Sequence, residues 1–99
     1  MLPNDEKLIA IAYLVNSSIL HVRERYKDGE LIKYSYHLMK GGKIIRWDNV
    51  PHHKGMSTYP HHKHENETIK ESYKMDINEV LKELKIVESR RKNDLSDSF

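Results

Sequence analysis

Two neighbouring segments alternate between apolar and polar residues over most of their length, and this pattern constrains the fold more than any other feature. The segments are residues 19–26 (ILHVRERY) and 31–39 (LIKYSYHLM). Alternation with a period of two is typical of β-strands that have one buried face and one face in water. Only a short polar segment containing Asp28-Gly29 separates them, so the sequence predicts an antiparallel hairpin.

The register of this hairpin follows from its apolar faces, because a slip of one residue turns a strand over. A two-residue turn at Asp28-Gly29 would place apolar residues opposite polar ones. A three-residue loop over 27–29, with a left-handed glycine in a bulge, keeps the faces apart and is the turn we expect. The expected partners are Glu24 with Ile32, Val22 with Tyr34 and Leu20 with Tyr36.

Gly41-Gly42 predicts a second hairpin through a two-residue turn. Its expected partners are Lys40 with Lys43, Leu38 with Ile45, Tyr36 with Trp47 and His37 with Arg46. Together the hairpins predict an apolar, aromatic sheet face made of Leu20, Val22, Tyr26, Ile32, Tyr34, Tyr36, Leu38, Ile45 and Trp47. The opposite face would be basic and would carry His21, Arg23, Arg25, Lys33, His37 and Arg46.

The ends of the chain complete the predicted fold. Residues 7–15 (KLIAIAYLV) read as a first strand and residues 67–73 as a short last strand. Asp76 is expected to cap a C-terminal helix, whose apolar stripe is Ile77, Val80, Leu81, Leu84 and Val87. The predicted class is α+β: an antiparallel β-meander of four to five strands, with one C-terminal helix packed on the aromatic face. We expect residues 1–92 to form a single domain and residues 93–99 a disordered tail.

Composition narrows the function. A chain of 99 residues can build one core. It contains no cysteine, which excludes thiolate metal sites and a cysteine nucleophile. No apolar run is long enough to span a membrane and the start does not resemble a signal peptide, so we expect a cytoplasmic protein without a membrane partner. Residues 17–64 carry nine Lys/Arg against four Asp/Glu and all seven histidines. This excess of positive charge favours an anionic partner, with RNA or DNA as the first candidates.

A doubled Pro-His-His-Lys motif stands out in residues 51–54 and 60–63. Between His52 and His64 the chain has five histidines and two lysines, which cannot all be buried cheaply. Three interpretations remain open. The histidines act in metal-independent RNA cleavage, they bind a metal ion, or they only line the surface of a loop that is packed down by its prolines and aromatic residues.

RNA cleavage needs a base for the 2′-hydroxyl proton, an acid for the leaving 5′-oxygen and cations for the charge on phosphorus. Histidine can serve in either proton role near neutral pH. An acid and a base that act on one phosphate must lie within about 7 Å of each other. Tyr59 can stack on a base.

A metal site is suggested by the spacings His61-x-x-His64 and His62-x-His64, with Asp48 or Glu65 as a carboxylate ligand for zinc or nickel. The lysine inside each motif argues against it, because a positive charge would stand next to the ion.

Several motifs resemble one family. The stretches His21-Val22-Arg23-Glu24, Lys33-Tyr34-Ser35-Tyr36-His37, Ile45 to His53 and Thr58 to His64 are similar to those of the TumE family of toxin–antitoxin proteins. The likeness covers roughly residues 7–87, and the pair Asp-Asn-x-Pro-His-His plus Pro-His-His-Lys-His is specific. The resemblance implies a toxin from a small prokaryotic operon, partnered by a helix-turn-helix antitoxin.

The sequence hypothesis is therefore a metal-independent endoribonuclease toxin, with a non-catalytic nucleic-acid- or antitoxin-binding module and a histidine-ligated metal-binding protein as alternatives. It assigns no cofactor and no metal. Its partners are RNA and an antitoxin, and it is compatible with a homodimer. His53 and His62 are the first choices for acid and base. The candidate catalytic residues are His53, His62, His61, His64, Lys54 and Lys63, and the candidate nucleic-acid-binding residues are Arg23, Arg25, Lys33, His37, Arg46 and Tyr59.

Overall fold

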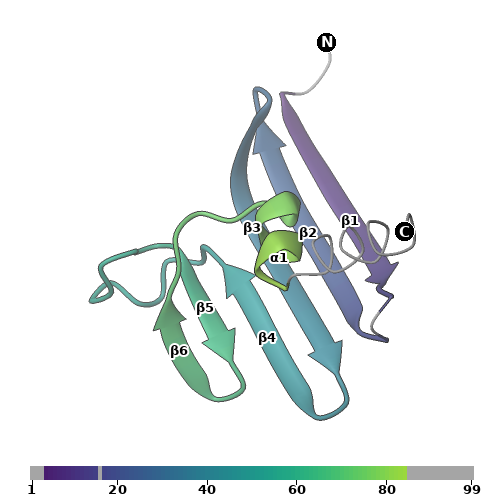
Figure 1. The fold of residues 1–99 in the computed structure, drawn as a ribbon. Coiled ribbons are helices and arrows are strands. Elements are labelled where there is room, and N and C mark those ends of the chain that lie inside the picture. Colours follow the sequence, from purple (N-terminus) through teal and green to yellow (C-terminus); the bar gives the residue numbers. More distant parts are fainter. Residues whose placement is uncertain (1–3, 16, 85–99) are drawn as a thin grey trace, which may run out of the picture.

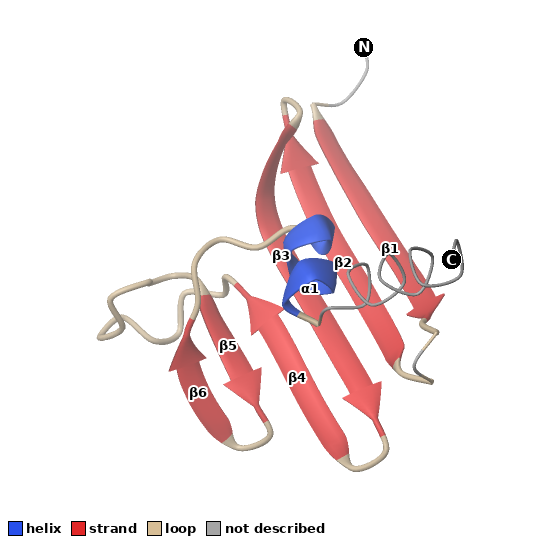
Figure 2. Cartoon of the chain, in the orientation of Figure 1, coloured by secondary structure: helices blue, strands red, loops and turns tan. Residues whose placement is uncertain are grey.

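Strands that follow one another in the chain also lie side by side in the sheet, as the alternating segments predict. The computed structural model describes residues 4–15 and 17–84. It contains one six-stranded antiparallel sheet in the order β1-β2-β3-β4-β5-β6 and a helix, α1 (Figures 1 and 2). The elements are β1 Asp5–Tyr13, β2 Ile19–Lys27, β3 Glu30–Lys40, β4 Lys43–Asp48, β5 His62–Glu65, β6 Thr68–Glu71 and α1 Ile77–Glu83. The predicted α+β meander with one C-terminal helix is confirmed, with six strands in place of four to five.

The first hairpin corrects the expected register. Lys27 pairs with Glu30 across a two-residue Asp28-Gly29 turn, and both turn residues have positive φ. The register then shifts within β3, because Tyr26 pairs with Leu31 and Arg25 with Lys33. The residue between them in β3 is left out of the ladder, and this bulge restores the segregation of faces that the turn alone would destroy.

One core assignment changes with that bulge. Ile32, expected on the aromatic face, is exposed, and its neighbour Leu31 packs against the core instead. Beyond the bulge Val22 pairs with Tyr36 and Leu20 with Leu38. The observed register therefore differs from the expected one by two residues. A shift of two residues does not turn a strand over, so the remaining side chains of both strands lie on their predicted faces.

The second hairpin has the expected register throughout. Gly41 adopts a left-handed conformation in the turn, with φ of +57°. The four predicted pairs are present: Lys40 with Lys43, Leu38 with Ile45, Tyr36 with Trp47 and His37 with Arg46. Two glycines leave this turn little steric restriction, so the faces of the flanking strands decide the pairing.

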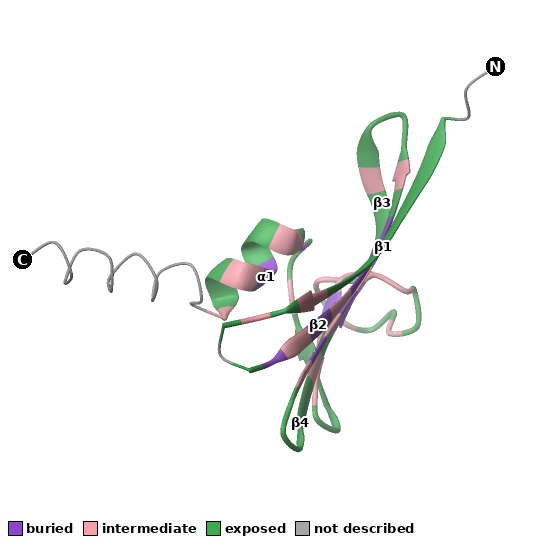
Figure 3. Cartoon of the chain, turned by 90° about the vertical axis from the view of Figure 1, so that its right-hand side faces the viewer, coloured by how far each residue is buried: buried purple, intermediate pink, exposed green. Residues whose placement is uncertain are grey.

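The core lies between one face of the sheet and α1, as expected. Its fully buried side chains include Trp47, Tyr34, Tyr36 and Leu20 from the sheet and Val80 from the helix. Figure 3 shows α1 on one side of the sheet only. Asp76 is the N-cap of α1 and accepts a hydrogen bond from the backbone of Glu79 at 2.8 Å. Val87, from the predicted apolar stripe, and the predicted tail lie outside the described residues.

A buried carboxylate is built into this core. Glu24 accepts hydrogen bonds from the hydroxyl groups of Tyr36, at 2.6 Å, and Tyr26, at 3.0 Å. Burial raises the pKa of Tyr36, so its hydroxyl keeps the proton that it donates. The two tyrosine hydroxyl groups provide hydrogen-bond donors for the Glu24 carboxylate, whose burial in an apolar layer would otherwise be costly.

The last two strands differ from the expectation. The segment 62–65 (HKHE), expected to belong to a loop, forms β5 between β4 and β6. The turn to β6 begins at Asn66, whose side chain accepts a hydrogen bond from the backbone of Ile44 on β4. The predicted last strand is shorter than residues 67–73 and covers Thr68–Glu71.

The first strand, apolar on both faces, is an edge of the sheet. Such a pattern is typical of strands covered on both sides, yet most of β1 is exposed within the described part of the chain. Its exposed apolar side chains are Leu8, Ile9, Ile11 and Tyr13.

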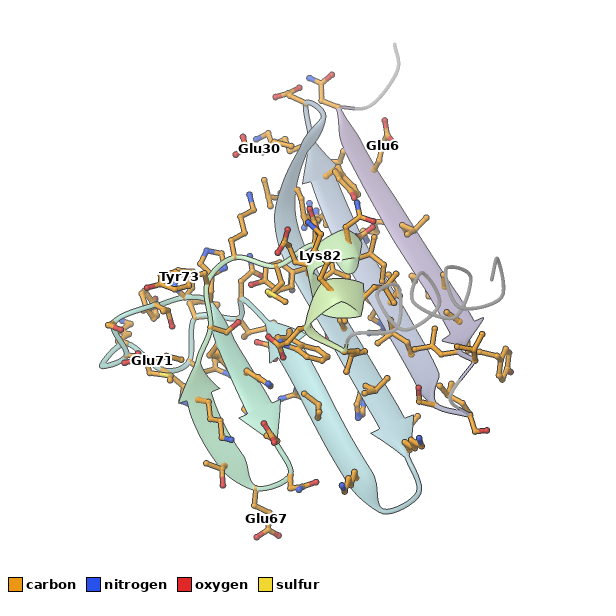
Figure 4. All side chains as sticks on the ribbon, viewed as in Figure 1. Glu6, Glu30, Glu67, Glu71, Tyr73 and Lys82 are labelled. Carbon is orange, nitrogen blue, oxygen red and sulfur yellow. The ribbon has the colours of Figure 1, made fainter. Side chains whose placement is uncertain are left out.

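Charged side chains such as Glu6, Glu30 and Glu67 project from the ends of strands and turns (Figure 4). In the described residues, no helix is long and apolar enough to cross a membrane.

The two-residue turn yields a stability prediction. Gly29 has φ of +80°, whereas no positive φ occurs at Gly42 in the next turn, and both have open space where a Cβ would stand. We expect Gly29→Ala to lower the free energy of unfolding by about 1 kcal/mol, because a side chain disfavours this conformation. Gly42→Ala, the matched control, should change it much less. Urea unfolding of both variants measures the difference, and equal effects would contradict the turn geometry.

Candidate functional site: a histidine cluster in a basic hollow

A hollow of about 600 Å³ combines residues of the sheet with the connection from β4 to β5. Cross-strand pairs build its floor. Asp48 pairs with Ser35 of β3 and with His62 of β5, and Arg46 pairs with His64 of β5. Among the described residues, its lining includes the basic and histidine side chains Lys7, Arg23, Arg25, Lys33, Arg46, His52, His53, His62 and His64.

The carboxylate of Asp48 is the centre of this arrangement. It is almost fully buried, and its Oδ1 accepts a hydrogen bond from the backbone of Val50 at 3.0 Å and lies 2.9 Å from His62 Nε2. Its Oδ2 lies 3.0 Å from Arg46 Nε and 3.8 Å from His64 Nε2. Each contact involves a potential proton donor, so Asp48 neutralises the positive charge around it.

Three histidines converge beside Asp48. The ring centroids of His53 and His62 are 4.8 Å apart, those of His53 and His64 5.7 Å, and those of His62 and His64 4.8 Å. One ligating atom from each ring lies within 4.8 Å of the others. The two first choices for acid and base therefore meet within the distance that one phosphate allows.

The three rings differ in their surroundings. His62 is buried and held at both ends, by the carbonyl oxygen of Pro60 at Nδ1 and by Asp48 at Nε2. His64 is half-buried, and burial together with Arg46 lowers its pKa from 6.5. The ring therefore stays neutral at pH values somewhat below 6.5. Within the described residues, the His53 ring makes ring contacts only, with its neighbours His52, His62 and His64.

Other candidate catalytic residues lie elsewhere. Lys63 is on the opposite face of β5, where its ammonium group is 2.7 Å from Glu83 and stands over the ring of Trp47. His61 stacks on Tyr34 and shares a 2.9 Å hydrogen bond with its hydroxyl group. Lys54 is exposed and does not line the hollow.

The candidate nucleic-acid-binding residues are largely gathered in the hollow. Arg23, Arg25, Lys33 and Arg46 all line it. Arg25 is 3.6 Å from Asp5 and Arg46 is held by Asp48, whereas Arg23 and Lys33 have no acidic partner in the described part of the chain. Tyr59 and His37 are not part of the lining.

Sequence reasoning missed the importance of Asp48, which it considered only as one of two carboxylates near a metal. The second hairpin contains the signal. Once Arg46 is opposite His37 on the basic face, Asp48, two residues further along β4, must lie on that face as well. Ser35 and His52, which are not among the candidate site residues from the sequence, also line the hollow. Glu65, the other carboxylate, instead pairs with Lys63 and Lys70 on the far side.

The chemistry of the hollow follows from this donor set. Neutral and cationic imidazoles can transfer protons, guanidinium and ammonium groups can bind phosphate, and imidazole with carboxylate can bind a metal ion. The fold and the site together define a small α+β protein with a basic pocket around three histidines.

The sequence model of a protein family described as "Toxin TumE" matches residues 3–91. The chain therefore belongs to the TumE toxin family, as its motifs suggest. Membership implies a toxin that has a cognate antitoxin. Searches of curated proteins and of solved structures found no match.

The Asp48 network predicts a large loss of stability when its centre is removed. Asp48→Ala leaves Arg46 and His62 without their buried partner, so we expect the free energy of unfolding to fall by about 3 kcal/mol. Asp5→Ala, the control, breaks an ion pair with Arg25 in which both side chains are about half exposed. It should cost less than about 1 kcal/mol. Denaturant titrations compare the two, and similar losses would show that Asp48 is not a structural centre.

The surroundings of His37 predict that the free energy of unfolding depends on pH. Burial lowers its pKa from 6.5, and Arg46 and His21 lower it further. Its buried Nε2 has no hydrogen-bond partner. Below pH 6.5 the unfolded chain therefore binds the proton more readily than the folded chain, and stability falls with acidification. Relative to the wild type, His37→Gln should gain stability between about pH 7.5 and pH 5. Parallel curves of unfolding free energy against pH would contradict this.

Proposed function

We propose that this member of the TumE toxin family is a metal-independent endoribonuclease that binds RNA in the basic hollow. One observation carries the proposal: three histidines meet beside a buried carboxylate, next to two cations that have no acidic partner among the described residues. The proposed partners are RNA as substrate, the cognate antitoxin and a second copy of the chain. The proposed place of action is the cytoplasm, where RNA is available.

The cations support a polyanion as the ligand. Arg23 and Lys33 are on adjacent strands, two residues apart in register, because Arg23 pairs with Ser35. Two neighbouring cations on one sheet face repel each other, and a phosphate group between them would reverse the sign of that interaction. Arg25 and Arg46 add positive charge to the lining of the hollow.

The histidines support proton transfer, with roles that geometry can assign. His53 and His64 are half-buried and line the hollow, so both can reach a bound substrate. His62 is buried and both of its nitrogens are engaged, so it serves as a positioning residue. Asp48, 3.8 Å from His64, would stabilise the imidazolium that forms when His64 accepts a proton. His64 is therefore the proposed base and His53 the proposed acid.

The reaction follows from these roles. His64 removes the proton of the 2′-hydroxyl group while the 2′-oxygen attacks phosphorus. The bond from phosphorus to the 5′-oxygen breaks, and His53 protonates that oxygen. The products are a 2′,3′-cyclic phosphate and a 5′-hydroxyl end. Arg23 and Lys33 stabilise the negative charge that develops on the phosphate oxygens.

Purified protein incubated with RNA in EDTA tests the proposal. We expect cleavage by the wild type and a loss of about 100-fold or more in rate for His53→Ala and for His64→Ala, since each removes a proton carrier. His21→Gln is the control, because this histidine is on the same sheet face but outside the lining of the hollow. Product ends identified by mass spectrometry should carry the cyclic phosphate.

Three results would overturn the proposal. No cleavage in EDTA, or cleavage restored only by added metal, would exclude the metal-free mechanism. RNA binding that weakens with salt, without any change in RNA length, would identify a binding module instead. Growth inhibition in cells that is unaffected by His53→Ala or His64→Ala would separate toxicity from this site.

A further inference from the structure

A second kind of ligand fits the same group of side chains. We propose that His53, His62, His64 and Asp48 form a four-ligand site for a divalent transition-metal ion, zinc above all, and that the bound ion switches off the toxin. The binding site stands on geometry alone. The inhibition rests on the proposed ribonuclease function.

The ligand atoms are close to the spacing that zinc requires. Zinc bonds nitrogen and oxygen at about 2.0–2.2 Å, so neighbouring ligands of a tetrahedral site are about 3.3 Å apart. Here Asp48 Oδ1 is 2.9 Å from His62 Nε2, and Asp48 Oδ2 is 3.8 Å from His64 Nε2. One nitrogen from each of the three histidines lies within 4.8 Å of the others. Small side-chain rotations would bring Asp48, His62 and His64 to this spacing, and His53 would complete the set from its place beside the two other histidines.

The hydrogen bonds around the cluster match the outer shell of a metal site. A metal-binding histidine usually donates its second ring N–H to a carbonyl or carboxylate group, which fixes the nitrogen that faces the ion. His62 Nδ1 is 2.9 Å from the carbonyl oxygen of Pro60, which directs Nε2 at Asp48. Asp48 is itself held by Arg46 and by the backbone of Val50. These contacts would keep two ligands oriented before an ion binds.

The structure also removes the main objection to a metal. Each Pro-His-His-Lys motif places a lysine next to its histidines in sequence, which predicts repulsion of a cation. Lys63, however, projects from the other face of β5 and pairs with Glu83. Lys54 is exposed and does not line the hollow. Of the cations that line the hollow, Arg46 contacts a proposed ligand directly, and its charge is opposed by Asp48 at 3.0 Å.

The number of ligands indicates the consequence of binding. Hydrolytic zinc sites keep one position open for water, whereas sites with four protein ligands are closed. Three histidines and Asp48 fill a tetrahedron, so the ion would have no position for an attacking water. It would also occupy the imidazoles of His53 and His64, the two groups proposed to transfer protons. Binding would therefore inhibit cleavage.

Metal binding is tested directly on the full chain, without RNA. Isothermal titration with zinc should give one site of micromolar or better affinity, and cobalt(II) should show the visible absorption bands of a four-coordinate ion. His53→Gln should weaken zinc binding by more than the roughly 10- to 100-fold that loss of an outer-shell partner costs. His53 is chosen because its ring has no hydrogen bond in the described structure, so its replacement should leave the fold intact. His21→Gln is the matched control and should bind zinc as the wild type does.

The outcomes separate the two proposals. No binding, or equal binding by the wild type and His53→Gln, would overturn the metal site and leave cleavage in EDTA untouched. Binding that His53→Gln abolishes, in a protein that does not cut RNA in EDTA, would support the site and overturn the ribonuclease. If both activities are present, one equivalent of zinc should suppress cleavage by at least tenfold, and unchanged cleavage would refute the inhibition.

Discussion

The buried carboxylate of Asp48 holds together the candidate functional site. Asp48 is the last residue of β4. Its carboxylate accepts a hydrogen bond from the backbone N–H of Val50, at the start of the long connection to β5, and contacts the two histidines of β5. A charge this deeply buried is tolerated only when it is fully partnered. Here every partner also belongs to the candidate site, so the local fold and the chemistry have the same electrostatic requirement.

The two faces of the sheet have separate roles because of strict alternation along β4 and β5. Trp47 and Lys63 face the helix, where the Trp47 indole donates a hydrogen bond to Glu83 and the Lys63 ammonium pairs with the same carboxylate. Asp48, His62 and His64 face the hollow. Adjacent residues thus serve opposite sides, which explains how a motif with alternating histidine and lysine can place imidazoles together without bringing lysines with them.

Much of the fold could be predicted from local sequence, and the failures have physical causes. The register of the Gly41-Gly42 hairpin was predicted correctly, because the flanking strands separate apolar from polar residues clearly. The Asp28-Gly29 turn was missed because a bulge at Ile32, invisible to a face-matching argument, corrects the register later. The short β5 was missed because its residues carry no apolar signal and are held by pairing with β4. Convergence of His53 with His64 depends on the path of the connection, which periodicity does not describe. Of the two metal-binding spacings that the sequence suggested, His61-x-x-His64 is not realised, because His61 stacks on Tyr34. Both histidines of the other spacing, His62-x-His64, belong to the cluster.

Asp48 and His62 are cross-strand partners, although the connection 49–61 separates them in the chain. The hairpins from β1 to β4 join through short turns and need little chain entropy to close. Closing the longer connection costs more, and that cost is recovered only when β5 pairs with β4 and the histidines reach Asp48. The site is therefore expected to be the last part of the sheet to assemble and the first to open. During folding, strands β1 to β4 would therefore pair before the pocket is complete.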